Sequence, residues 1–164
     1  MPKRLEFEEN AYYHVYNRGL NKQILFHNNK DFQRFLLYLD IYKNKCKKEL
    51  GIISYCILPN HFHFVLLNKS QSHKISYFIG NICASYTRYY KAKYGADKGV
   101  LYFESRFKAK LIDNDEYLQQ CIQYVEYNAL KHKLVEKGAD RIFRSDSGSK
   151  LGSEILDLDW EFEF

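Results

Sequence analysis

Strand-like and helix-like patterns of apolar residues alternate along most of the chain. The runs at 12–16, 51–58 and 61–67 are rich in strand-forming residues. Only Pro59-Asn60 separates the last two runs, which predicts an antiparallel hairpin. Alternating basic and apolar residues at 106–111 predict a fourth strand that has one cationic face.

Apolar residues three and four positions apart predict three amphipathic helices, over 31 to about 47, 75 to about 93 and 113 to about 133. Asn28 and Asn29 are available to cap the first helix. Asp113 followed by Glu116 resembles a capping box, with Asp113 as the cap of the last helix.

The order of these elements predicts an α+β fold, a ferredoxin-like sandwich in which helices cover one face of an antiparallel sheet and a tyrosine-bearing helix follows at the C-terminal end. We expect residues 1–135 to form one domain. Residues 136–164 are expected to be a flexible connector and an acidic tail, because 137–153 are rich in Gly, Ser and Asp. Acidic and apolar residues alternate from 155 to 164, so the tail could dock as an edge strand.

Charge is distributed unevenly between these two parts. Residues 1–135 hold 21 Lys and Arg against 12 Asp and Glu, whereas residues 136–164 hold 4 against 8. A basic body with 15 tyrosines and 12 phenylalanines suits a polyanion whose bases can stack on aromatic rings. A solvated lysine-rich surface over an aromatic core explains the same composition, so charge alone does not choose between the two.

Several classes of protein do not fit the sequence. No apolar run approaches the roughly 18 to 20 residues of a membrane span, and the N-terminal residues lack the apolar centre of a signal peptide. We therefore expect a cytoplasmic protein without a membrane partner. The cysteines are scattered without a CxxC pair, which predicts reduced thiols rather than a disulfide framework or a zinc knuckle.

Candidate chemistry begins with His61 and His63. Residues two apart on a strand point to the same face, so both imidazoles project side by side at a spacing suited to one cation. Two histidines on a strand are more often ordinary surface or hydrogen-bonded residues, so this pair needs a third ligand and a nucleophile beside it.

The last predicted helix offers both groups. Tyr124 and Asn128 are four residues apart and therefore share a helix face. Two imidazoles and an amide oxygen suit Mg²⁺ or Mn²⁺ and leave positions for phosphate oxygens. Tyr127 is the rival nucleophile, but it points about 100° around the helix from Asn128, so Tyr124 is preferred.

Four motifs together resemble the HUH tyrosine transposases, and in particular their branch associated with repetitive extragenic palindromes (REP). These motifs are YHVYNRG at 13–19, LPNHFH at 58–63, RFK at 106–108 and QYVEYN at 123–128. The resemblance covers residues 11–135 in order. In two positions the chain departs from the family: Asn128 stands where many relatives have glutamine, and Ala129 where proline is usual.

The resemblance implies an enzyme that cleaves and rejoins single-stranded DNA at hairpins. It implies that Tyr124 attacks a phosphate to give a 5′-phosphotyrosine link and a free 3′-hydroxyl, while His61, His63 and Asn128 hold Mg²⁺ or Mn²⁺. Related enzymes build the site within one chain or take the tyrosine helix from a partner, so a homodimer is left open. The chemistry is reasonable, because a phenol with a pKa of about 10 needs a nearby cation to ionise at neutral pH.

Basic residues are expected to contact the DNA backbone. We assign this role to Arg18 of the first motif and to Arg106, Lys108 and Lys110, which would line one face of the fourth strand. Two other functions stay open at this stage. One is a noncatalytic nucleic-acid-binding module, and the other is a metal-dependent phosphodiesterase in which water attacks and Tyr124 only packs.

Overall fold

The sheet is antiparallel throughout and has the strand order β4-β1-β3-β2-β5. The computed structural model describes residues 6–71, 73–95, 102–104, 106–131 and 143–144, with residues 126, 128–131, 143 and 144 described as backbone alone. The strands are β1 (Ala11–Arg18), β2 (Leu50–Leu58), β3 (His61–Asn68), β4 (Lys108–Ile112) and β5 (Phe143–Arg144), and the helices are η1 (Leu20–Lys22), α1 (Asn29–Cys46), α2 (Lys74–Tyr94) and α3 (Asp115–Lys131).

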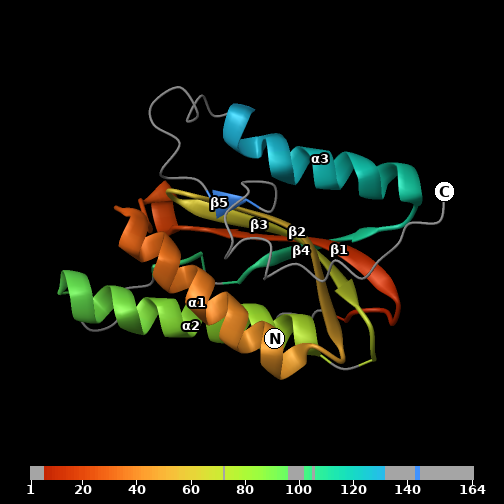
Figure 1. The fold of residues 1–164 in the computed structure, drawn as a ribbon, viewed down its shortest axis with the longest axis horizontal. Coiled ribbons are helices and arrows are strands. Elements are labelled where there is room, and N and C mark those ends of the chain that lie inside the picture. Colours follow the sequence, from red (N-terminus) through yellow and green to blue (C-terminus); the bar gives the residue numbers. More distant parts are fainter. Residues whose placement is uncertain (1–5, 72, 96–101, 105, 132–142, 145–164) are drawn as a thin grey trace.

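Helices lie on both sides of this sheet. Figure 1 shows α1 and α2 together on one side and α3 on the opposite side. The predicted sandwich is therefore confirmed, and α1 and α2 are the pair that shares one face. The structure adds the position of the tyrosine-bearing helix, which covers the other face.

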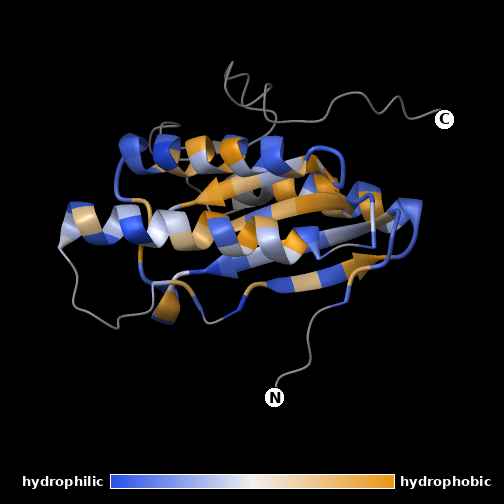
Figure 2. Cartoon of the chain, turned by 90° about the horizontal axis from the view of Figure 1, so that it is seen from below, coloured by the Kyte–Doolittle hydropathy of each residue, from blue (hydrophilic) through white to orange (hydrophobic). Residues whose placement is uncertain are grey.

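Alternation along β3 supplies side chains to both layers. Phe62, Phe64 and Leu66 are fully buried with the aromatic residues of α1 and α2. His63 and Val65 point the other way, toward α3, where Val65 joins a second and smaller apolar cluster. In Figure 2 some strands are largely hydrophobic and others carry several hydrophilic positions, while the helices alternate between the two. Nearly all residues of β2 and β3 are buried, as expected of apolar strands that are covered on both faces.

Local signals predicted most of the element boundaries. Leu58 pairs with His61 across Pro59-Asn60, so the predicted hairpin is confirmed. Asn28 caps α1 and takes part in a capping box with Asp31. Of the cysteines, Cys46, Cys56 and Cys121 are buried, and all of them are free thiols.

Two local predictions were wrong. The cap of α3 is Asn114 rather than Asp113, because the Asn114 Oδ1 accepts a hydrogen bond of 2.8 Å from the backbone N–H of Tyr117. The fourth strand begins at Lys108, so Arg106 lies before the strand and is not part of its cationic face.

The C-terminal predictions concern residues that are mostly outside the described part. The boundary expected after residue 135 and the acidic edge strand at 155–164 both lie outside it. Within the expected connector, Phe143 and Arg144 form β5, pairing with Ile57 and Cys56 of β2. These two residues extend the sheet at its β2 edge.

Candidate active site

The paired histidines lie at the start of β3, in the centre of the sheet. His61 is opposite Arg18 of β1, and His63 is opposite Tyr16. Because directly opposed residues share a face, all four side chains belong to the face that α3 covers. The ring centroids of His61 and His63 are 5.2 Å apart, and only 7% of His63 is exposed. The predicted juxtaposition of the two imidazoles is confirmed.

Tyr124 of α3 lies against these rings in the same chain. Its ring makes T-shaped contacts with two imidazoles. The ring centroids are 5.7 Å apart for His63 and 5.8 Å apart for His14. The tyrosine side chain is nevertheless 43% exposed, so solvent or a substrate can reach it. The Tyr124 ring therefore contacts His63, one of the paired histidines, within one subunit.

The apolar stripe of α3 explains why Tyr124 lies there. Leu118, Cys121 and Val125 are buried against Cys56, Leu58 and Val65 of β2 and β3. Val125 directly follows Tyr124 and is fully buried, which fixes the rotation of the helix at this point. Tyr127, the rival nucleophile, is 58% exposed. Asn128 lies on α3 one turn after Tyr124, and the structure describes its backbone alone.

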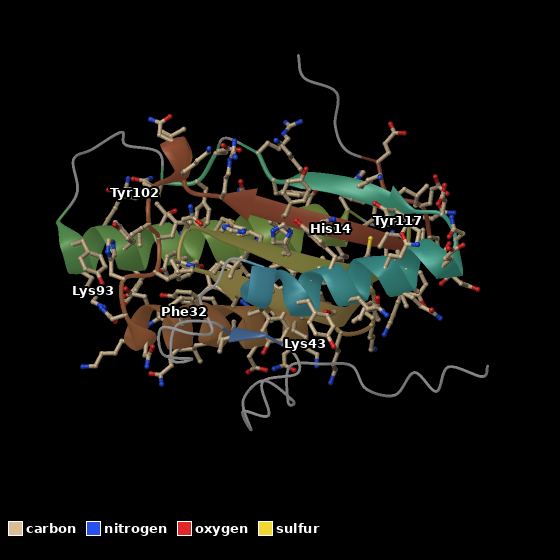
Figure 3. All side chains as sticks on the ribbon, turned by 90° about the horizontal axis from the view of Figure 1, so that it is seen from above. His14, Phe32, Lys43, Lys93, Tyr102 and Tyr117 are labelled. Atoms are coloured by element: carbon tan, nitrogen blue, oxygen red, sulfur yellow. The ribbon has the colours of Figure 1, made fainter. Side chains whose placement is uncertain are left out.

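His14 is a site residue that the sequence reasoning missed. Its Nε2 lies 3.0 Å from Nδ1 of His63, and the two rings are stacked. Figure 3 shows His14 on β1 near the middle of the sheet. Burial lowers the pKa of His14 to about 4, and the charge of the nearby Lys110 adds to this effect. His14 is therefore neutral at physiological pH.

A signal for His14 was present in the first motif. His14 and Tyr16 alternate with buried residues, so they share a face of β1, and an antiparallel partner would place them beside a histidine strand. Tyr16 indeed stacks on His63 with ring centroids 5.5 Å apart. The identity of the partner strand was the missing piece of information.

Asn60 orients the other histidine. The Asn60 Nδ2 donates a hydrogen bond of 3.1 Å to the carbonyl of Lys22, which turns its Oδ1 toward His61. The distance from this Oδ1 to the His61 Nδ1 is 2.6 Å. The amide oxygen can only accept, so the His61 Nδ1 carries the proton. The lone pair of this ring is then on Nε2.

An open pocket of about 550 Å³ lies beside the histidines. Its lining includes both histidines and the cationic residues Arg18 and Lys22. Arg18 also forms an ion pair of 2.5 Å with Glu104. The sequence-predicted Arg18 is therefore next to His61 and His63.

Two further cations extend from this pocket along β4. Lys108 lies opposite Tyr16 and Lys110 opposite His14, so both belong to the face with the histidines. The Nζ of Lys108 is 5.9 Å from the ring centre of Tyr16, and that of Lys110 is 4.6 Å from the ring centre of Tyr117. A hydrogen bond with Tyr117 raises the pKa of Lys110. Arg106 is exposed but lies outside the strand, so the predicted row of three cations is reduced to two.

Comparison with known proteins identifies the class to which this fold and site belong. His63 of β3 and Tyr124 of α3 lie in contact on one face of the sheet, and a family model of transposases matches the chain. The model described as "Transposase IS200 like" matches residues 8–128. The chain belongs to the IS200-like transposase family.

Solved structures share the fold at low sequence identity. A REP-associated tyrosine transposase bound to a REP hairpin is 17% identical, with a TM-score of 0.64 over 83% of this chain and 76% of that one. The tRNA(His) guanylyltransferase of Saccharomyces cerevisiae is 13% identical, with a TM-score of 0.56 over 82% of this chain and 65% of that one. No curated protein sequence matches the chain.

Within the described ranges, no helix is long and apolar enough to cross a bilayer. Among the same residues, no group of three His, Cys, Asp or Glu side chains is arranged to hold a metal ion.

Proposed function

We propose that this protein cleaves single-stranded DNA beside a hairpin and transfers the strand through a covalent bond to Tyr124. The observation that supports this most directly is the contact of the Tyr124 ring with His63, 5.7 Å between centroids. The transposase family and the hairpin bound by the similar transposase support DNA as the substrate.

In the proposed reaction the phenolic oxygen of Tyr124 attacks a phosphorus atom of the strand. A bond forms between this oxygen and phosphorus, and the bond from phosphorus to the 3′-oxygen breaks. The 3′-oxygen leaves with a proton from water as a 3′-hydroxyl, and the phenolic proton passes to solvent, which reaches this half-exposed side chain. Attack by a later 3′-hydroxyl reverses the step and joins two strands, because the phosphodiester energy is conserved in the phosphotyrosine.

The histidines fit a divalent cation. His61 presents the lone pair of Nε2, as the hydrogen bond of its Nδ1 to Asn60 requires, and His63 lies beside it on the same face. We propose that His61, His63 and Asn128 hold Mg²⁺ or Mn²⁺, with the remaining positions left for phosphate oxygens. Such an ion would polarise the phosphate and favour the phenolate.

The cations around the pocket would position the strand. Arg18 and Lys22 line the pocket, and Lys108 and Lys110 continue along the same face of the sheet. Such residues contact phosphates and fix the register of the strand without reading its bases.

The test is covalent capture of hairpin oligonucleotides that carry single-stranded flanks. We expect wild-type protein with Mn²⁺ to retain a 3′-end label on denaturing gels and to release a 5′-labelled fragment that a polymerase can extend. Tyr124→Phe should abolish the adduct, because it removes only the attacking oxygen. Tyr127→Phe, an equally conservative change three residues away, should leave the adduct intact.

Other outcomes identify the alternative functions. Cleavage that persists in Tyr124→Phe would refute the tyrosine mechanism and indicate a phosphodiesterase that uses water. Binding without any cleavage would indicate a noncatalytic module. The metal role is tested by His61→Gln against His73→Gln, an exposed histidine before α2, and only the first should weaken Mn²⁺ binding.

Subunit mixing tests whether one chain forms the site. Because Tyr124 touches His63 of its own chain, a mixture of the Tyr124→Phe and His61→Gln variants should stay inactive. Recovery of adduct in the mixture would show that a partner supplies the tyrosine.

A further inference from the structure

His14 is positioned to control which nitrogen of His63 carries a proton. His63 is almost completely buried, and a buried ring nitrogen requires a hydrogen-bonding partner. The Nε2 of His14 provides that partner for the His63 Nδ1 at 3.0 Å. Ring stacking between the two imidazoles fixes their relative orientation.

The neighbouring histidine shows the direction that such a bond takes in this site. His61 donates through Nδ1 to the Asn60 oxygen, whose orientation is set by the bond from its Nδ2 to the Lys22 carbonyl. Metal-binding histidines commonly donate one ring N–H to a second group in this way, which fixes the tautomer and turns the other nitrogen toward the metal. His14 occupies the corresponding place behind His63.

We propose that His14 is a positioning residue that accepts the proton of the His63 Nδ1 and thereby holds the His63 lone pair on Nε2, toward the cation. This inference rests on the proposed metal site. His14 itself would not bind the ion, because its Nε2 is directed at the His63 Nδ1 rather than at a shared centre. His14 would thus hold His63, and Asn60 would hold His61, in the same Nδ1–H tautomer before a metal ion binds.

The structure offers a matched pair of substitutions. His14→Phe keeps an aromatic ring against Tyr16 and Tyr124, which both contact the His14 ring, but removes the acceptor. His14→Gln retains an oxygen that can accept from His63. Thermal unfolding of both variants shows whether each is folded.

The primary measurement is the ¹⁵N chemical shifts of the histidine ring nitrogens in metal-free protein. We expect His63 to carry its proton on Nδ1 in the wild type and in His14→Gln, and to shift toward the Nε2–H form in His14→Phe. His61 should stay in the Nδ1–H form in all three proteins and serves as the internal control. Finding Nε2–H on His63 in the wild type would overturn the proposal without any metal being added.

Metal titration provides the second measurement. We expect Mn²⁺ affinity to fall about 10- to 100-fold in His14→Phe and to be largely restored in His14→Gln. Unchanged affinity in His14→Phe would overturn the proposal, as would three coordinated imidazoles in the electron spin-echo spectrum of the Mn²⁺ complex. An Nδ1–H tautomer in a wild type that binds no Mn²⁺ would support the role of His14 and refute the metal site of the proposed function.

Discussion

His14 makes the stability of this fold sensitive to acid. Burial lowers its pKa from 6.5 to about 4, so the unfolded chain takes up a proton at a higher pH than the folded one. The contribution of neutral His14 to the unfolding free energy is complete above pH 6.5 and is lost as the pH falls toward 4. By linkage, this difference amounts to about 3 kcal/mol of unfolding free energy across that interval.

Urea unfolding followed by far-ultraviolet circular dichroism measures the effect, with a chelator present throughout. The reference is His14→Gln, which cannot titrate but keeps a polar side chain at this position. Other histidines titrate in both proteins, so the difference between them isolates His14. We expect the wild type to lose about 3 kcal/mol more than the variant between pH 7 and pH 4. A parallel loss in the two proteins would refute the reasoning that burial keeps His14 neutral.

Three further predictions concern packing, a buried charge and DNA binding. Val125→Ala should lower the unfolding free energy by about 2 kcal/mol, because Val125 is fully buried between α3 and the sheet, and unfolding in urea would show it. Asp31→Asn should cost about 3 kcal/mol and lower the melting temperature, since its buried carboxylate accepts bonds from two tyrosines and a lysine. Lys108→Gln should reduce the salt dependence of DNA binding by about one phosphate contact, whereas Lys47→Gln, an exposed change beyond the end of α1, should not.

The parts of the fold that the sequence predicted correctly depend on short-range signals. The hairpin at Pro59-Asn60 is set by a two-residue link, and the start of α1 by the side chain of Asn28. Where two adjacent residues could serve equally, as Asp113 and Asn114 before α3, only the hydrogen bond distinguished them. The basic and apolar alternation at 106–111 also overstated the fourth strand, because pairing with β1 begins at Lys108.

Among the candidate site residues, too, those that short-range patterns indicate were predicted, and those that depend on strand pairing were not. The shared direction of His61 and His63 was predicted because a strand repeats every two residues, and Tyr124 was proposed because it lies off the apolar stripe of its helix. His14 was missed because its contact with His63 spans 49 positions, and no local sequence pattern predicts which strand pairs with which. Arg18 was proposed from its motif. Lys22 was not predicted, because it lines the pocket only as a result of the turn that follows β1.

By itself the sequence determined the succession of strands and helices and the common direction of the two imidazoles, since each follows from residue types at fixed short spacing, and the resemblance of its four motifs indicated the family. The tertiary structure decided which face of the sheet α3 covers and which strand lies beside β3. An amphipathic helix carries one apolar stripe that either face of a sheet can bury, so the choice depends on how well the whole set of side chains packs. That choice brings the Tyr124 ring onto His63 and places His14 behind it.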